Sequence, residues 1–321
     1  MKAESSLSSL HPQCAALLEA LQVQGQLSID QVSPEDARRT YAARGDFKPL
    51  PISVARTEDV CVPVEAHRLT LRLYRPLGSS NDALLPTLIY FHGGGWLLGS
   101  INTHDALCRE LCNAAQACVV SVDYRLAPEH PYPAAIEDAR AALGWVFDNA
   151  ADAGVDAQRI AVGGDSAGAN LAAVLAIEAR GPTNRKIAFQ MLVYPPVDLR
   201  CSSESYDRCG EGFGLTRDHM NYFVRQYAGD ADIGDWRLSP GRCDSLENVA
   251  PALIIVAGFD PLRAEGVAYA QRLSAAGVRT TLVEFPRQIH GFFTLGRMVD
   301  EANDAIRICG ATVQRALMPT P

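Results

Sequence analysis

The sequence predicts an α/β fold in which a mainly parallel β-sheet is covered by helices on both faces. Strand-like and helix-like segments alternate along most of the chain, as they do where helices join parallel strands. Hydrophobic residues make up 48% and charged residues 21% of the 321 residues, as in ordinary globular proteins. A chain of this length corresponds to about two domains, or to one large domain with an insertion.

The first expected elements are two short helices and two strands. One helix is expected around Ala15–Leu21 and another after Ser33 and Pro34, residue types that are common at helix starts. The leucines of Leu69–Leu73 alternate with polar residues, which indicates a half-buried strand. The largely apolar run Thr87–Phe91 indicates a strand that is buried on both faces.

The rest of the core is expected to continue the alternation. Apolar residues three or four apart define the helices, and short apolar runs define the strands. In chain order the expected elements are strand Ala117–Asp123, helix Pro133–Asn149, strand Ile160–Gly163, helix Ala167–Arg180, strand Phe189–Tyr194, strand Leu253–Ala257, helix Leu262–Ala276, strand Thr280–Phe285 and helix Val299–Leu317.

The interval Pro195–Ala250 interrupts this alternation. It contains turn-rich stretches, one expected helix at Arg217–Tyr227 and no clear strand. A segment this long without a core of its own is more often a lid than a linker. It also lies between strands whose C-terminal edge is where a parallel sheet binds its ligands. We therefore expect it to cover a functional site.

The charge balance argues against polyanionic partners. The 29 basic and 37 acidic residues give a net charge of −8, and no cluster of Lys and Arg provides the positive surface of a nucleic-acid-binding protein. The opening residues lack the apolar stretch of a secretory signal, and no run approaches the roughly 18 apolar residues of a membrane span. We expect a cytoplasmic protein without a nucleic-acid partner or a membrane span.

The cysteines are expected to be reduced. There are nine, an odd number, and a domain of this size can fold without disulfide bonds. Cys108 and Cys112 lie four residues apart on an expected helix, but no second Cys or His pair occurs at zinc-finger spacing. We expect these two residues to be small buried apolar groups, and we expect no metal.

A candidate nucleophile lies in the sequence GDSAG at Gly164–Gly168, which fits the pattern G-x-S-x-G. It follows an expected strand and precedes an expected helix, as the pattern requires. The glycines permit a tight turn that exposes the serine hydroxyl, and the N–H groups at the helix start can stabilise a developing anion. Ser166 is therefore the candidate nucleophile. A glycine-rich turn with an N-cap serine would be the better interpretation if the pentapeptide stood alone.

A serine nucleophile needs a general base, usually a histidine that a carboxylate orients. His290 lies in a loop expected at Pro286–Gly291, directly after a strand, and Asp260 follows another strand in the same way. The order Ser166, Asp260, His290 is the order found in α/β-hydrolases.

Other histidines and acids fit less well. Some lie near the N-terminus or in the insertion, and others lie in contexts typical of structural residues: His11, His67, His104, His130 and His219. Glu284 and Asp198 also lie near strand ends, but neither follows the turn that would place it beside the serine and the histidine.

The sequence HGGGW at His92–Trp96 follows the buried strand Thr87–Phe91. Consecutive glycines let backbone N–H groups approach a substrate oxygen without obstruction by side chains. This is what an oxyanion hole requires, and each such donor contributes about 3 kcal/mol in acyl transfer. A phosphate-binding loop would need a P-loop lysine or a G-x-G-x-x-G frame, and neither is present.

Together these motifs resemble the hormone-sensitive-lipase-like family of α/β-hydrolases, the bacterial esterases of lipolytic family IV. The resemblance covers roughly residues 70–317. Its landmarks are HGGGW at His92–Trp96, DYRLAPEHPYPAAIED at Asp123–Asp138, GDSAGANL at Gly164–Leu171, GFDPLRAEG at Gly258–Gly266 and HGF at His290–Phe292.

The resemblance implies an α/β-hydrolase fold with a helical cap and assigns the site residues by position. The expected division is N-terminal cap helices at 1–45, the first part of the core at 46–194, a cap insertion at 195–250 and the second part of the core at 251–321. The implied catalytic residues are Ser166 as nucleophile, His290 as general base and acid, and Asp260 as orienting carboxylate, with backbone N–H donors to the oxyanion from Gly94, Gly95 and Ala167. The residues suggested for the substrate pocket, each of which would also suit the core, are Trp96, Phe213 and Leu215.

The resemblance implies hydrolysis of short to medium acyl esters through an acyl-enzyme, with no metal or organic cofactor. Dimers are common in the family, so a homodimer is among the expected assemblies. Two alternatives stay open: an amide, carbamate or lactone substrate, and a non-catalytic small-ligand receptor. Plant gibberellin receptors resemble the family but have lost the catalytic histidine position, whereas His290 is present here.

The chain departs from the family pattern at two positions. Ala169 stands where the family often has glycine, which affects the packing of a helix on a strand. Ala264 stands where the family has an acidic residue, so a side chain that could hold the acid-bearing loop is missing. Because neither position belongs to the expected triad, we expect changes in the degree of activity only.

Overall fold

The computed structural model describes residues 10–23, 29–43, 50–64, 67–80, 83–181 and 185–318. In this part of the chain an eight-stranded sheet has the order β1-β2-β4-β3-β5-β6-β7-β8. Strand β2 pairs antiparallel with β1 and β4, and every other neighbouring pair is parallel. The strands are β1 (Arg56–Val64), β2 (His67–Arg75), β3 (Leu85–Phe91), β4 (Cys118–Val122), β5 (Val155–Asp165), β6 (Phe189–Val193), β7 (Ala252–Phe259) and β8 (Thr280–Ile289). The prediction of a mainly parallel sheet is confirmed.

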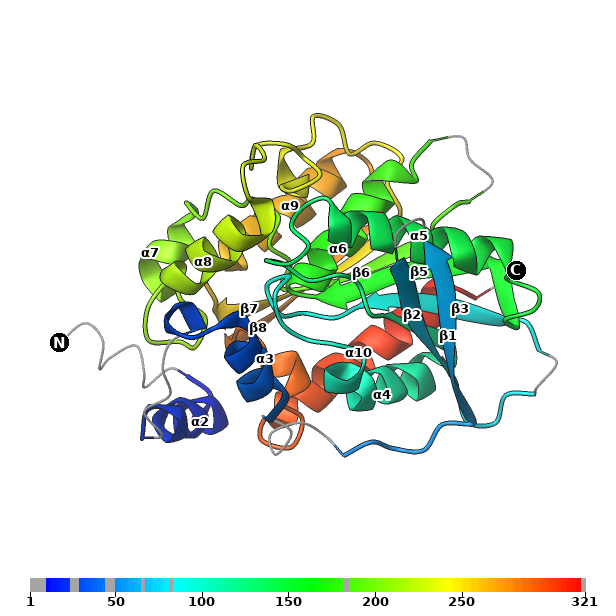
Figure 1. The fold of residues 1–321 in the computed structure, drawn as a ribbon, viewed down its shortest axis with the longest axis horizontal. Coiled ribbons are helices and arrows are strands. Elements are labelled where there is room, and N and C mark those ends of the chain that lie inside the picture. The colour runs from blue at the N-terminus through cyan, green and yellow to red at the C-terminus, as the bar shows by residue number, and fades with distance from the viewer. Residues whose placement is uncertain are drawn as a thin grey trace.

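Helices cover both faces of this sheet (Figure 1). One face carries α4 (Asp105–Ala115) and α10 (Asp300–Ala316), and the other carries α5 (Ala134–Asp148), α6 (Ala167–Glu178) and α9 (Arg263–Ala275). Alternate side chains of a strand therefore enter two separate cores. In β3, Leu88 and Tyr90 pack into the core on the α4 and α10 side, whereas Ile89 and Phe91 pack into the opposite core.

A second group of helices gathers at one end of the sheet (Figure 1). It comprises α2 (Pro12–Val23), the short 3₁₀ helix Ile29–Gln31 and α3 (Pro34–Ala43) from the N-terminal region, with α7 (Glu204–Cys209) and α8 (Arg217–Ala228) from residues 195–250. Helix α3 begins as predicted, because the backbone N–H of Asp36 donates to Oγ of Ser33 at 3.1 Å. Parts of the predicted N-terminal cap, residues 1–9, 24–28 and 44–45, lie outside the described residues.

The predicted helices of the core are confirmed to within two residues at each end. At the periphery two elements were not predicted and one predicted loop differs. Strand β1 was not expected, because its side chains are mostly exposed and show no apolar alternation. Helix α7 was not expected in a stretch that appears turn-rich. The loop predicted at Pro286–Gly291 is strand as far as Ile289. Pro286 is tolerated because β8 is the last strand of the sheet, where a missing N–H donor leaves no partner strand unpaired.

The cysteines are all unpaired and, apart from Cys61, buried. Burial raises the pKa of the Cys108 and Cys112 thiols well above their usual value, which fits their expected place in the core. Within the described ranges, no three His, Cys, Asp or Glu side chains cluster as metal ligands would. None of the helices described there is long and apolar enough to cross a bilayer.

Candidate active site

Ser166 occupies the turn between strand β5 and helix α6. Its backbone has φ 52° and ψ −121°, a conformation that residues other than glycine rarely adopt. The turn is fixed from below, because the N–H of Ser166 donates to the carbonyl of Val193 on β6 at 2.9 Å. The serine hydroxyl is thereby raised above the C-terminal edge of the sheet, as the G-x-S-x-G pattern predicts.

The two glycines of the motif are required by the close approach of strand β3. A Cβ on Gly164 would lie 2.3 Å from the carbonyl oxygen of Phe91, and a Cβ on Gly168 would lie 1.9 Å from the same atom. Both distances are far below van der Waals contact. Ala169, on α6, is fully buried in the core, so the first departure from the family pattern is accommodated as an ordinary core methyl group.

Ser166, His290 and Asp260 meet at this edge. Nε2 of His290 lies 3.0 Å from Oγ of Ser166, and Nδ1 lies 2.7 Å from Oδ2 of Asp260. The Asp260 side chain is fully buried and only 11% of the His290 side chain is exposed. The second Asp260 oxygen accepts the N–H of Leu262 at 2.8 Å, which fixes the carboxylate. In this arrangement Nδ1–H donates to Asp260 and leaves Nε2 free to accept the serine proton.

The parallel sheet explains why three distant residues converge. Ser166 follows β5, Asp260 follows β7 and His290 follows β8. The C-terminal ends of parallel strands lie along one edge, so residues that follow them share one site. Because β8 continues to Ile289, His290 comes directly after a regular strand rather than from the middle of a loop.

The loop that carries Asp260 is held by residues that the sequence did not point to. The buried hydroxyl of Ser205, on α7, donates to the carbonyl of Pro261 at 2.5 Å and accepts the N–H of Ala264 at 3.1 Å. This hydroxyl holds the loop at the position where the family's acidic side chain is missing. Oε1 of Glu265, in the first turn of α9, accepts the N–H of Val197 at 2.8 Å, which ties the helix after this loop to the start of the 195–250 segment.

The HGGGW segment forms a tight turn beside Ser166. Gly94 and Gly95 have φ values of 129° and 62°, which favour glycine. The carbonyl of Gly94 accepts the N–H of Leu98 at 2.9 Å. A Cβ on Gly95 would lie 2.4 Å from the ring of Phe223 on α8. The turn is therefore packed closely on both sides, and Gly94 and Gly95 line the same cavity as Ser166.

This cavity has a volume of about 730 Å³, within the range of small-molecule sites. Its floor includes Ser166, His290 and the glycine turn, and its walls come from the N-terminal helices and from the 195–250 segment. The wall residues are mostly apolar: Leu17, Leu18 and Leu21 of α2, Ile29 and Val32, Ala37, Thr40 and Tyr41 of α3, Leu215, and His219, Met220 and Phe223 of α8.

The three residues suggested for the pocket differ in their positions. Leu215 lines the cavity. Trp96 also contributes to the lining, but its ring is fully buried and stacks on Tyr227 with 4.5 Å between ring centroids. Phe213 is not among the residues that line this cavity, and it lies in the core with its ring packed against Phe259 at 5.0 Å between centroids.

Several residues at the site were missed by sequence reasoning. The leucines of α2 could have been recognised, because Leu17 and Leu21 lie four residues apart and so share one helix face. The ring of Tyr194, at the end of β6, packs against His290 with 4.4 Å between centroids. Asp165 was treated as the variable position of the GDSAG motif. Its carboxylate is nevertheless buried and bonded to the HGGGW segment.

Comparison with known proteins agrees with this architecture. A family model described as the alpha/beta hydrolase fold matches residues 88–294, which is more than half of the chain. The chain belongs to the α/β-hydrolase family. The relatives support the hormone-sensitive-lipase-like resemblance within that family.

Two relatives of this α/β-hydrolase and one solved structure illustrate the similarity. Carboxylic ester hydrolase LipN of Mycobacterium tuberculosis is 47% identical over 74% of this chain and 64% of its own length, so the match leaves about a third of LipN uncovered. Ethyl acetate hydrolase of Pseudomonas putida is 36% identical over 96% of this chain and all of its own. The ester-hydrolase EH1AB1 from the metagenome of Lake Arreo, solved with a derivative of bipyridine phosphonate, is 41% identical with a TM-score of 0.91, covering 95% of this chain and 98% of that one.

Proposed function

We propose that this α/β-hydrolase is a serine carboxylesterase that hydrolyses short to medium acyl esters through a covalent acyl-enzyme. The observation that carries the proposal is the continuous contact from Ser166 through His290 to the buried Asp260, with distances of 3.0 and 2.7 Å. The names of the relatives, which are ester hydrolases, support the same reaction class.

In the proposed reaction, His290 acts first as a base and then as an acid. Nε2 removes the proton of Ser166 as Oγ attacks the ester carbonyl, and the resulting imidazolium is stabilised by Asp260. The imidazolium returns the proton to the departing alcohol. A water molecule then attacks the acyl-enzyme by the same route, which releases the acid and restores the serine.

The developing oxyanion is proposed to accept hydrogen bonds from the N–H groups of Gly94, Gly95 and Ala167. Helix α6 begins at Ala167, and the first N–H groups of a helix have no partner within the helix. The helix dipole also favours a negative charge at this end. Because Gly94 and Gly95 carry no Cβ, their backbone can approach the substrate oxygen closely.

We propose that the N-terminal helices and the 195–250 segment form the cap expected from the sequence and select the substrate. Their apolar side chains suit acyl chains, and a cavity of about 730 Å³ holds a small ester more readily than a long triglyceride. The nucleic-acid, cytoplasmic and homodimer expectations stay predictions.

The test is hydrolysis of p-nitrophenyl esters from acetyl to palmitoyl by the wild type beside Ser166→Ala. Alanine replaces serine at φ 52° with similar backbone strain, so the variant should fold, which circular dichroism would check. We expect activity on the short esters that falls by at least about 10³-fold in the variant. Full activity in Ser166→Ala would overturn the proposal.

An inactive wild type would favour one of the alternatives. Amide, carbamate and lactone substrates share the tetrahedral oxyanion, so they are assayed next with the same pair of proteins. The receptor alternative is disfavoured by the contact of His290 with Ser166, which a binding function alone does not require.

A further inference from the structure

We propose that Asp165 is a positioning residue that holds the oxyanion-binding turn in register with the nucleophile. The inference rests on the proposed esterase function and adds a residue to its machinery. Asp165 immediately precedes Ser166, and its Oδ1 accepts the N–H of Gly93, the residue before Gly94 and Gly95, at 2.9 Å. One carboxylate thus joins the turn that carries the nucleophile to the turn that carries two of the oxyanion donors.

The carboxylate is enclosed by groups that fix its orientation. It is only 3% exposed. Besides the N–H of Gly93, Oδ1 accepts the hydroxyl of Tyr90 at 2.6 Å, and Nε2 of His104 lies 3.5 Å from it. Burial alone would raise the pKa of Asp165, but His104, Tyr90 and His92 outweigh this effect and hold the pKa below its ordinary value. Asp165 is therefore an anion at neutral pH, and an ionised acceptor forms a stronger hydrogen bond with a backbone N–H.

Gly93 also packs so closely against the Asp165 carboxylate that no side chain would fit there. A Cβ on Gly93 would lie 2.3 Å from Oδ2 of Asp165. Gly99 packs equally closely against Gly93 from the other side of the turn. A Cβ on Gly99 would lie 2.4 Å from the carbonyl oxygen of Gly93. Gly93 is therefore held between the carboxylate and the returning chain, and a displacement of Asp165 would move the donors that follow it.

A buried anion next to the oxyanion hole needs an explanation other than charge stabilisation. A negative charge at this position disfavours the negative oxygen that forms during attack on the ester. Leaving a buried carboxylate in place is costly unless it is fully bonded. Within the described residues, the role that its contacts support is to fix the geometry of Gly93, because hydrogen-bond donors stabilise an oxyanion only when they are already in position.

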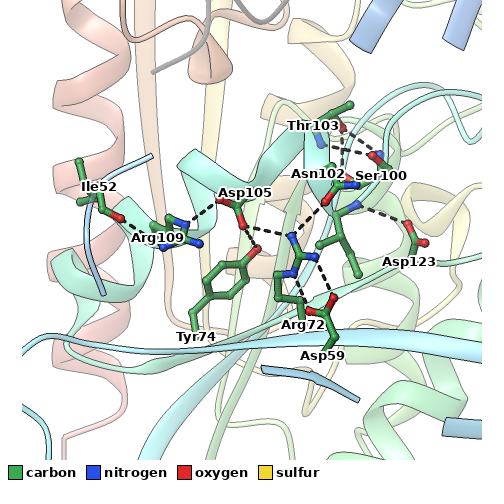
Figure 2. A network of polar contacts seen from close by, with 11 residues as sticks. Ile52, Asp59, Arg72, Tyr74, Ser100, Asn102, Thr103, Asp105, Arg109 and Asp123 are labelled. Atoms are coloured by element: carbon green, nitrogen blue, oxygen red, sulfur yellow. Dashed lines mark hydrogen bonds and ion pairs between the residues drawn. The ribbon is translucent and has the colours of Figure 1, made fainter. Parts of the chain in front are cut away.

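The groups around Asp165 are themselves anchored. His104 ends the 3₁₀ helix Asn102–His104, and its Nδ1 lies 2.9 Å from Oγ1 of Thr103. Figure 2 shows the adjoining network, in which Asp105 accepts the hydroxyl of Tyr74 at 2.9 Å and is also contacted by Arg72. The segment that carries His104 is thus fixed to strand β2.

The test compares Asp165→Ala and Asp165→Asn with the wild type. Alanine removes the acceptor, whereas asparagine keeps one oxygen that can accept from Gly93. We expect kcat to fall about 10- to 100-fold in Asp165→Ala with KM changed less than about 3-fold, a smaller loss than removal of an oxyanion donor causes. Asp165→Asn should recover part of this loss.

A transition-state analogue separates positioning from simple stability. An aryl trifluoromethyl ketone forms a tetrahedral oxyanion on the serine, so its inhibition constant should rise in parallel with the loss of kcat/KM. Inhibition by butyrate, which forms no such adduct, should not change. If Asp165→Ala does not fold, Gly93→Ala provides the second variant: it retains every polar group but places a methyl against Oδ2, and the same signature is expected.

Asp156→Asn is the matched control. Oδ1 of Asp156 accepts a backbone N–H, that of Gln158, at 2.9 Å, as Asp165 does, but Asp156 lies at the opposite end of β5 from Ser166. The substitution should lower Tm without changing kcat or the inhibition constant of the ketone. The proposal is overturned if folded Asp165→Ala has a lower Tm but the kcat and the ketone inhibition constant of the wild type. The same holds for folded Gly93→Ala where that variant is used in its place. Because all variants are compared with a wild type whose activity depends on Ser166, this outcome is distinct from failure of the esterase proposal.

Discussion

The floor and the N-terminal wall of the cavity are held by different kinds of interaction. The floor lies on β5, β7 and β8, between two apolar cores, and its three central side chains are largely buried. In the N-terminal wall, α2 packs Leu17 and Leu18 into one of these cores, whereas α3 buries only Ala37 and is also held by polar contacts of Arg38. The floor can therefore fix atoms to within the tolerance that the reaction requires, whereas α3 has less apolar packing to hold it in place.

The polar contacts of the wall are specific. In α3, Arg38 donates to the carbonyls of Leu97 and Ala127 at 2.8 and 2.9 Å and pairs with Glu129 at 2.6 Å. Near the start of α2, the N–H of His11 donates to the carbonyl of Arg287 on β8 at 2.9 Å. A partly exposed ion pair such as Arg38–Glu129 contributes about 0 to 1 kcal/mol to the free energy of unfolding.

The largest expected effect tests the floor. Asp260→Asn should retain the fold, because the amide has nearly the same shape, but should lower kcat by about 10³- to 10⁴-fold. The amide favours the wrong tautomer of His290 and cannot stabilise its charged form. Steady-state kinetics on p-nitrophenyl butyrate and a thermal unfolding curve would measure both effects. Near-wild-type turnover in this variant would mean that another carboxylate orients His290.

A smaller effect is expected when the wall is loosened. Arg38→Met retains most of the apolar stem but removes the donors to Leu97, Ala127 and Glu129. The loss of about 1 kcal/mol of attachment should raise KM about 3- to 10-fold and leave kcat within about 2-fold. Arg39→Met is the matched control, because Arg39 is 70% exposed and its ion pairs are with residues of its own helix.

The outcome decides whether the wall and the floor are independent. If Arg38→Met lowers kcat as strongly as it raises KM, attachment of α3 also positions the catalytic groups. The contact of Arg38 with the carbonyl of Leu97, next to the glycine turn, would then be the route. If Arg39→Met has the same effect as Arg38→Met, the change reflects lost charge on the helix and not lost attachment.

The sequence predicted the floor better than the wall for a physical reason. Central strands are buried on both faces, so their apolar runs are visible in the sequence, and the residues that follow them must share one edge of the sheet. The order Ser166, Asp260, His290 was therefore legible without coordinates, although their catalytic roles stay a proposal. The strand β1 was missed because an edge strand with exposed side chains shows no such pattern.

Contacts between distant segments account for the other features of the site that the sequence did not predict. Asp165 and Gly93 are 72 residues apart in the chain, and nothing in either motif indicates that the carboxylate of one accepts the N–H of the other. Ser205 lies in a six-residue helix inside an irregular segment and holds the loop of Asp260. The sequence left Phe213 open between pocket and core for a related reason, because in a segment without periodicity the side that an aromatic residue faces depends on tertiary packing.

The smallest expected effect concerns the anchor between the floor and the 195–250 segment. Burial raises the pKa of Glu265 well above its ordinary 4.5, so the folded protein retains a proton there that the unfolded chain releases. The stability that this group contributes is present below the ordinary pKa and is lost as pH rises through the raised one. Glu265→Gln resembles the protonated acid and retains the oxygen that accepts the N–H of Val197. We expect the Tm of this variant to match that of the wild type near pH 5 and to exceed it increasingly up to pH 9.

The control is Asp59→Asn, which removes a carboxylate whose pKa Arg72 lowers. Its Tm should differ from that of the wild type by a constant amount over the same pH range. If the curves of Tm against pH are parallel for Glu265→Gln and the wild type, Glu265 is already ionised in the folded protein. The charged form would then be stabilised where Glu265 contacts the start of the 195–250 segment.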